Sequence, residues 1–133
     1  MIKVIFDTNF LMHALDFKGD IFQAIEDTVN QRIEKIILSP VLDEIQHLTV
    51  CGSNKINRRA KKTLELIQDK SLKFKIIDIQ WQTSTEVDQV IATYARKNQC
   101  YIATNDKELR KTLRKAGIPM IFIRQRSRIA VHR

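Results

Sequence analysis

Glycine, proline and cysteine are scarce in this sequence of 133 residues. Three glycines and two prolines exclude a collagen-like chain and argue against disordered, low-complexity linkers. Two cysteines are too few for the disulfide framework of a small secreted domain, and Cys51 and Cys100 are too far apart in sequence for a CxxC metal or redox motif. The default expectation is therefore a reducing, cytoplasmic setting.

Long apolar runs are also absent. A membrane-spanning helix needs about 20 apolar residues, whereas the first apolar stretch, Val4-Ile5-Phe6, ends at Asp7. We therefore expect no membrane span, no signal peptide and no membrane partner. Apolar residues make up 44% of the chain and charged residues 29%, as in ordinary globular proteins, and the length predicts a single domain.

The charge is positive and unevenly distributed. Lysine and arginine total 23 against 15 acidic residues, an excess whose sign fits a phosphate-rich partner or an anionic surface. The basic side chains concentrate in residues 51–75 and 96–133, which hold eight and eleven of them against two acidic residues each. Net charge alone does not distinguish between these partners.

Short apolar segments alternate with helix-length amphipathic segments along the chain. Segments that are apolar on both faces predict strands of a parallel sheet buried between helices, and their alternation with helices predicts an α/β fold. The expected strands are residues 2–6, 35–38, 73–79, 100–103 and 119–123.

Apolar residues at helical spacing predict helices over residues 54–70 and 85–97. Thr83 and Glu86 would form a capping box before the second of these helices. Two more helices are expected to begin near Pro40 and near Asp106. The apolar face predicted for the helix over 54–70 consists of Ile56, Ala60, Leu64 and Ile67.

Two aspartates follow predicted strands. Ligands of open parallel sheets bind beyond the carboxyl ends of the strands, which is where Asp7 and, after Thr104 and Asn105, Asp106 are expected. Each also has a structural interpretation, because Asp106 could cap the following helix and Asp7 could stabilise a turn. Asn9 and Thr104 are the expected neighbours that would hold the two carboxylates in ligand geometry, although Asn9 could equally be a helix cap.

Glu44 and Asp88 are expected near the starts of helices that return to the same edge. Alone, each is explained equally well as a solvated or helix-terminal acid. Together with Asp7 and Asp106 they would repel one another unless cations neutralised them. An all-oxygen set suits one or two Mg²⁺ or Mn²⁺ ions rather than zinc. The histidines, His13 among them, are isolated in the sequence and expected at the surface.

Four sequence blocks resemble the motifs of the PIN-domain family of metal-dependent ribonucleases. They are Asp7-Thr8-Asn9, Glu44 within residues 40–45, Asp88 within residues 86–92, and Thr104-Asn105-Asp106. They occur in the family's order and span nearly the whole chain. The resemblance implies a three-layer α/β/α domain with a mostly parallel sheet and hydrolysis of RNA phosphodiesters, with Asp7, Glu44, Asp88 and Asp106 as catalytic metal ligands. Many members have a second acid where this chain has Gln89, which leaves the number of metal ions open.

Basic side chains that repeat at positions i, i+3, i+4 and i+7 form two helical stripes. With few acidic residues among them they are the expected RNA contacts, although a solvated surface would have the same pattern. After a domain over residues 1–123, the segment 124–133 has too few apolar side chains to guarantee a fixed structure, and we predict a basic tail that guides RNA and takes no part in catalysis. The alternative is that Ile129 and Val131 dock against the domain and support the site. The expected contacts are Lys55, Arg58, Arg59, Lys62, Lys107, Arg110, Lys111, Arg114, Arg124, Arg126 and Arg128.

Within the family, the basic helix over 54–70 and the arginine-rich end resemble the PIN nuclease of the small-subunit processome and its archaeal counterparts. This resemblance implies ribosomal RNA processing or small-subunit assembly, with a ribosomal RNA precursor as partner. Two alternatives stay open: a VapC-type toxin ribonuclease with an antitoxin as partner, and a catalytically weak RNA-binding assembly factor. A second copy of the chain, in a homodimer, is a further candidate partner.

Two other classes with an aspartate after the first strand fit the sequence less well. Phosphatases of the haloacid dehalogenase type require a second aspartate where this chain has Asn9. Response-regulator receiver domains require an acidic pair near the start and a lysine after a late strand, which have no match in this sequence.

Overall fold

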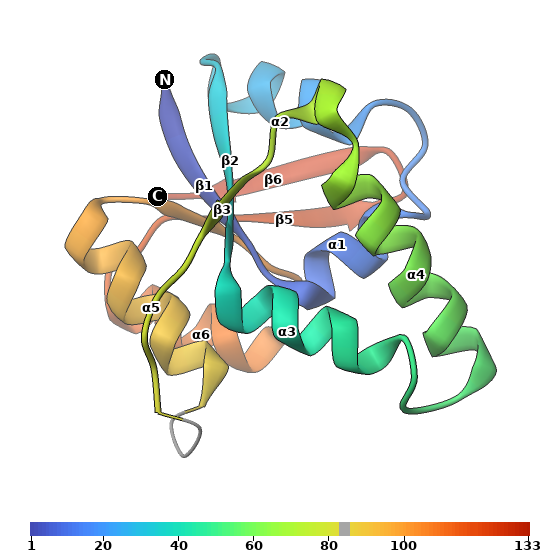
Figure 1. Cartoon of the computed structure of the whole chain (residues 1–133). Helices are drawn as coiled ribbons and strands as arrows, with labels where there is room; N and C mark the ends of the chain where they lie inside the picture. The colour runs from blue at the N-terminus through green and yellow to red at the C-terminus, as the bar shows by residue number, and fades with distance from the viewer. Residues whose placement is uncertain (83–85) are drawn as a thin grey trace.

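The computed structural model describes residues 1–82 and 86–133 as a series of alternating strands and helices (Figure 1). Three of the six strands lead within a few residues into a helix at their carboxyl end, which is the pattern expected of βαβ units. In chain order the elements are β1 (Ile2–Phe6), α1 (Thr8–Ala14), α2 (Ile21–Val29), β2 (Ile33–Leu38), α3 (Ser39–Leu48), α4 (Asn54–Gln68), the 3-10 helix η1 (Lys70–Leu72), β3 (Lys75–Ile77), α5 (Val87–Asn98), β4 (Tyr101–Ala103), α6 (Lys107–Lys115), β5 (Met120–Gln125) and β6 (Arg128–His132).

Within the described ranges the strands form one six-stranded sheet of order β3-β2-β1-β4-β5-β6. Strands β1 to β5 run parallel, and β6 is antiparallel to β5. Right-handed crossovers place α1 to α4 on one face of the sheet and α5 and α6 on the other, and Figure 1 shows α5 and α6 lying apart from α1, α2 and α4. The predicted three-layer α/β/α fold is confirmed.

The chain reverses its direction across the sheet between β1 and β4. From β1 it proceeds through β2 to the edge strand β3, whereas from β4 it proceeds the other way to β5. The register pairs Phe6 with Ala103, so that Asp7 and Thr104 follow neighbouring strands at the same level. A reversal of this kind opens a crevice at the carboxyl ends of the strands, where α/β proteins bind ligands.

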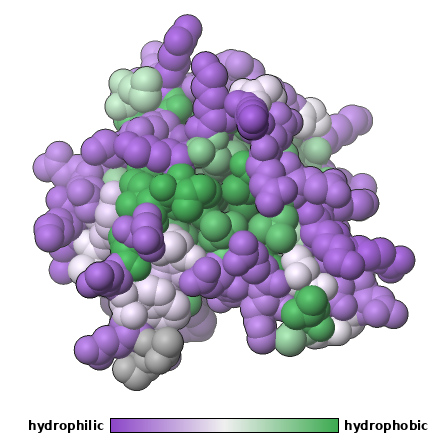
Figure 2. Space-filling model, in the orientation of Figure 1, coloured by the Kyte–Doolittle hydropathy of each residue, from purple (hydrophilic) through white to green (hydrophobic). Residues whose placement is uncertain are grey.

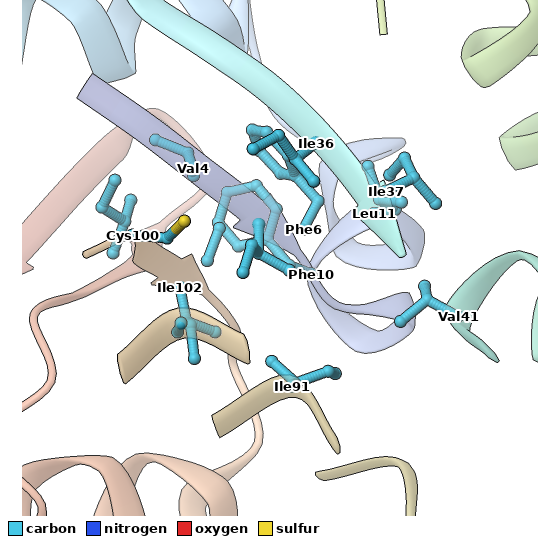
Figure 3. Close-up of a cluster of buried hydrophobic side chains, with 14 of the residues drawn as sticks. Val4, Phe6, Phe10, Leu11, Ile36, Ile37, Val41, Ile91, Cys100 and Ile102 are labelled. Carbon is cyan, nitrogen blue, oxygen red and sulfur yellow. The ribbon is translucent and has the colours of Figure 1, made fainter. Parts of the chain in front are cut away.

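Phe6, the last residue of β1, lies at the centre of the core. It is fully buried, and its ring packs against Phe10, Phe22 and Phe74 with centroids 5.5, 5.7 and 5.8 Å apart in tilted and edge-on geometry. Figure 3 shows side chains from β1, α1, β2, α3, α5 and β4 gathered in one apolar cluster. The end of β1 is therefore held by aromatic side chains from α1, from α2 and from the residue before β3.

Strand β3 is shorter than the predicted strand over residues 73–79. Lys73 has φ of 56°, outside the extended region, and the N–H of Ile79 donates to Ser39 Oγ at 3.0 Å instead of to a neighbouring strand. The edge beyond β3 is open, and Ile76 is 44% exposed. Figure 2, drawn from the same side as Figure 1, shows apolar side chains at the centre of the face toward the viewer, surrounded by polar ones.

The predicted helices are present with small shifts at their ends. Helix α5 begins at Val87, and the capping box with Thr83 lies outside the described residues. The apolar face predicted for α4 is wrong at Ile56, which is 37% exposed, because the buried positions of this helix begin only at Ala60. None of the helices in the described ranges combines the length and the apolarity needed to cross a membrane.

The predicted tail without a fixed structure is also wrong. Residue 123 lies within β5, and β6 continues the sheet, with Ile129 opposite Ile123 and Val131 opposite Ile121. The turn between the two strands is held by the N–H of Lys18, which donates to the carbonyl of Arg126 at 2.7 Å. Few apolar side chains suffice here because β5 supplies the hydrogen-bond partners of the added strand.

We expect deletion of residues 126–133 to destabilise the protein rather than only to remove charge. The deletion exposes one side of β5 and removes the half-buried Ile129 and Val131, which costs about 3 kcal/mol or more. Thermal unfolding followed by circular dichroism should show a midpoint lower by several degrees, whereas Arg128→Ala, which removes an exposed charge, should leave it unchanged. An unchanged midpoint after the deletion would contradict a structural role for β6.

Candidate active site at the carboxyl edge of the sheet

Asp7 and Thr104 lie at the carboxyl edge of the sheet, directly after the neighbouring strands β1 and β4. Asp7 is 6% exposed and Thr104 is fully buried. The hydroxyl of Thr104 donates a hydrogen bond to Asp7 Oδ2 at 2.8 Å, and its oxygen accepts one from the backbone N–H of Asp106 at 3.1 Å. The Asp7 N–H donates to the carbonyl of Ala103 at 3.0 Å. One hydroxyl thus connects the two aspartates that follow adjacent strands.

Burial raises the pKa of Asp7 to about 6. The hydrogen bond from Thr104 opposes this rise in pKa, and the negative charges of Asp88 and Glu44 add to it. A carboxylate at this position is therefore costly in free energy at neutral pH unless a positive charge comes near it.

The other three acids belong to helices that begin at the same edge. Glu44 is exposed on α3, Asp88 is half-buried in the first turn of α5, and Asp106 is the N-cap of α6. Burial raises the pKa of Asp88, and the negative charges of Asp106, Glu44 and Glu86 raise it further. Asp88 and Glu44 therefore lie within electrostatic range of Asp7, and Asp106 and Glu44 lie within electrostatic range of Asp88.

Asp106 caps α6, as the alternative interpretation of this residue predicted. Its Oδ1 accepts hydrogen bonds from the N–H groups of Glu108 and Leu109 at 2.9 and 3.3 Å. Both bonds go to one oxygen, so the cap fixes the direction in which the other oxygen points. Because α1, α3, α5 and α6 all begin at this edge, their positive dipole ends also favour anionic groups there.

Two asparagines hold the loop between β4 and α6 in place. Asn9 Oδ1 accepts from the N–H of Asn105 at 3.2 Å, so it contacts the loop backbone and not a carboxylate. The side chain of Asn105 accepts from the N–H of Ile123 at 2.8 Å and donates to its carbonyl at 3.0 Å. This role of Asn105 was not predicted, because an asparagine after a strand has many uses that look alike in sequence.

Comparison of the chain with known proteins identifies its family. The family described as a PIN like domain matches residues 4–126 of the chain. The chain belongs to the PIN-domain family. Its expected resemblance to that family is confirmed over nearly the whole sequence.

Two curated relatives of this PIN domain have names that indicate different roles. Ribonuclease VapC4 of Methanocaldococcus jannaschii is 33% identical over 127 residues, which cover 95% of this chain and 93% of the relative. The rRNA-processing protein fcf1 of Schizosaccharomyces pombe is 28% identical over 122 residues, which cover 90% of this chain and 58% of that protein. Among solved structures, the PIN domain endonuclease Utp24 superposes with a TM-score of 0.80 at 27% identity, covering 98% of this chain and 91% of that one.

PIN-domain nucleases use divalent metal ions, and the residues at this edge fit such an ion in two respects. The donor set consists of oxygens, with a buried carboxylate at its centre whose neighbours are negatively charged. The hydroxyl of Thr8, next to Asp7, is buried without a hydrogen-bond partner in the described part of the chain. In residues 1–82 and 86–133, however, no three acidic, histidine or cysteine side chains converge closely enough to hold a metal as they stand.

Two of the predicted RNA contacts have structural partners within the PIN domain. Arg59, expected on a solvated face, donates to Asp16 at 2.9 Å and to the carbonyl of Met12, and so ties α4 to the end of α1. The guanidinium of Arg110 lies 4.2 Å from the ring centroid of Phe122, a cation–π contact. The other members of the two stripes are exposed: Lys55, Arg58, Lys62, Lys107, Lys111 and Arg114.

We expect Asp7→Asn to stabilise the metal-free protein at pH 7. The folded state holds the proton of Asp7 up to a pKa of about 6, whereas an unfolded chain releases it near 3.8. Stability from this group is therefore present below pH 4 and is lost as the pH rises through 6, by at most about 3 kcal/mol. Urea unfolding in the presence of a chelator should show a gain for the variant at pH 7 that shrinks at pH 4.5. A loss of equal size at both pH values would contradict the raised pKa.

Proposed function

We propose that this PIN domain is a divalent-metal-dependent endoribonuclease that hydrolyses RNA phosphodiesters. The observation that carries the proposal is the burial of Asp7 among Glu44, Asp88 and Asp106 at the point where the strand order reverses. An anionic cluster of this kind needs positive charge, and Mg²⁺ or Mn²⁺ is the cation that carboxylate and hydroxyl oxygens suit. The relative from Methanocaldococcus jannaschii is a ribonuclease, which supports the reaction class.

Each residue of the site has a distinct task in this proposal. Asp7 and Asp106 would be direct ligands, with Thr104 orienting the first through its hydroxyl and the cap of α6 orienting the second. Asp88 would be a third ligand, and the exposed Glu44 would bind directly or through water. Bound ions would supply an activated water and neutralise the charge that builds on the phosphate. Because Gln89 stands where many members have an acid, one or two ions are both compatible with the chain.

RNA binding falls to the exposed basic side chains. Each Lys or Arg that contacts a phosphate releases counterions, so a few such contacts supply much of the affinity for single-stranded RNA. Arg59 and Arg110 support the fold, and the remaining proposed contacts are Lys55, Arg58, Lys62, Lys107, Lys111, Arg114, Arg124, Arg126 and Arg128.

Ribosomal RNA processing is the first candidate role, in the cytoplasm and with a ribosomal RNA precursor as substrate. The structural likeness to the PIN domain endonuclease Utp24 and the sequence likeness to fcf1 support it. A toxin ribonuclease with an antitoxin partner is the second candidate, which the 33% identity to VapC4 over 93% of that protein supports. Both roles use the same four acids.

Cleavage of RNA should require both divalent metal and the acidic cluster. With Mn²⁺ or Mg²⁺ we expect the chain to cut a generic single-stranded RNA and to unfold at a higher temperature, since ligand binding to the folded state stabilises it. Asp7→Asn and Asp106→Asn should each reduce cleavage by about a hundredfold or more. Asp27→Asn, a control at an exposed acid on α2, should change neither property. Metal-independent cleavage, or cleavage retained in both site variants, would contradict the proposal.

The two candidate roles predict different RNA partners in the cell. Crosslinking of the protein to RNA in its native cell should recover a ribosomal RNA precursor if it acts in processing. A toxin should instead recover a mature RNA, and its expression should arrest growth until a product encoded beside it is supplied. Growth arrest that Asp7→Asn abolishes, with no precursor among the crosslinks, would overturn the processing role.

A further inference from the structure

A groove of about 470 Å³ lies between the end of α1 and the end of β5. We name it the α1–β5 groove. Asn105 lines its inner end, one residue before Asp106, so the groove opens beside the acidic cluster. Its other polar and aromatic lining residues are His13, Asp16, Phe17, Arg124, Gln125 and Arg126.

The walls of the α1–β5 groove are fixed by hydrogen bonds on both sides. Asn105 is bonded to the backbone of Ile123 in β5 through both ends of its amide. At the outer end, the N–H of Lys18 donates to the carbonyl of Arg126 at 2.7 Å. The side chains of Arg124 and Arg126 are exposed, so they project from an anchored backbone into solvent, where phosphate oxygens can reach them.

The order of residues along α1 gives the groove a direction. Asn9 lies beside the acidic cluster, and His13, four residues later, lies about one helical turn of 5.4 Å farther out on the same face. Phe17, which follows the end of α1, is half-buried against the core and also lines the groove. Imidazole and phenyl rings present flat surfaces on which successive bases stack, a contact that single-stranded RNA makes with little regard to sequence.

A second groove continues from the first along α4. It has a volume of about 400 Å³, and Lys55, Arg58, Arg59 and Lys62 line it. We name it the α4 groove. Asp16 borders both grooves, and Figure 1 shows α1 lying between the β5–β6 hairpin and α4.

Asp16 is the one acidic residue at this junction among those that line the two grooves, and its charge is compensated. The guanidinium of Arg59 donates to both of its carboxylate oxygens, at 2.9 and 3.3 Å. This hydrogen bonding lowers the pKa of Asp16, and the positive charges of Arg59 and Arg126 lower it further. A phosphate that passes from one groove to the other therefore meets a paired carboxylate.

We propose that the α1–β5 groove holds the nucleotides on one side of the cleaved bond and that a single RNA strand continues from it into the α4 groove. This path rests on the proposed nuclease function and deepens it by naming the two grooves that hold the RNA strand and the side of the cut that the protein grips. It adds His13, Phe17 and Asn105 to the binding residues. The exposed basic residues of α6 lie on the opposite face of the sheet and do not border this path.

The path is tested by the salt dependence of binding, with chelator present so that no RNA is cut. The probes are fluorescein-labelled oligouridylates of increasing length and an RNA duplex. Arg124→Ala/Arg126→Ala and Lys55→Ala/Arg58→Ala each remove two exposed charges, and each should lower the slope of log K against log salt for the long single strand by about 1.4, since one phosphate contact contributes about 0.7. The matched control, Arg96→Ala/Lys97→Ala, removes two exposed charges from the last turn of α5 and should leave the slope unchanged.

Photocrosslinking supplies the second readout. An oligouridylate that contains 4-thiouridine should attach to the peptides that hold His13 and Phe17 and to the peptide from α4. Three outcomes would each overturn the path. The crosslinks could be confined to α6 or to α5, or the control variant could lose as much slope as the two path variants. The third outcome is tighter binding of the duplex than of the single strand. Thermal unfolding of all variants confirms that they are folded before binding is compared.

Failure of the path and failure of the proposed function have different signatures. If the wild-type chain cleaves RNA with Mn²⁺ but the two path variants bind long single strands as the control does, the nuclease stands and the path is wrong. If the path variants lose binding as expected while the wild-type chain cleaves nothing with any divalent metal, the path is supported and the nuclease function is wrong.

Discussion

The burial of one carboxylate, that of Asp7, is the constraint on which the rest of the site depends. Its hydrogen bond from Thr104 stabilises the charged form, but burial and the charges of Asp88 and Glu44 outweigh that bond, and the pKa rises to about 6. A folded protein that keeps such a group gives up stability at neutral pH. This cost is explained if the group binds a cation, because the same burial that disfavours the free carboxylate strengthens its attraction for the ion.

The position of this carboxylate follows from the order of the strands. β1 and β4 are neighbours although far apart in sequence, and the chain leaves them in opposite directions. The aromatic cluster around Phe6 fixes the end of β1, and Asn105 ties the loop after β4 to β5. The same tie shapes the inner end of the α1–β5 groove. Packing of the core, orientation of the acids and the RNA path proposed above therefore share one set of contacts.

The sequence predicted the features that depend on local periodicity and failed where long-range contacts decide. Strand ends and helix starts are encoded by runs of apolar residues, so the places of Asp7 and Asp106 were predictable. Arg59 and Arg110 have the spacing of a solvated stripe, and only the tertiary fold brings Asp16 and Phe122 to them. β6 was missed because an edge strand needs few apolar side chains once a neighbouring strand supplies its hydrogen bonds.

The central claim is most directly tested by the titration of the Asp7 carboxyl itself. Carboxyl carbon chemical shifts of Asp7, assigned by comparison with Asp7→Asn, can be followed by nuclear magnetic resonance from pH 3 to 8 with and without saturating Mg²⁺. The account predicts a pKa near 6 in the metal-free protein and a pKa below the ordinary value of 3.8 when Mg²⁺ is bound. An Asp7 that titrates near 3.8 without metal, and is unaffected by Mg²⁺, would contradict it.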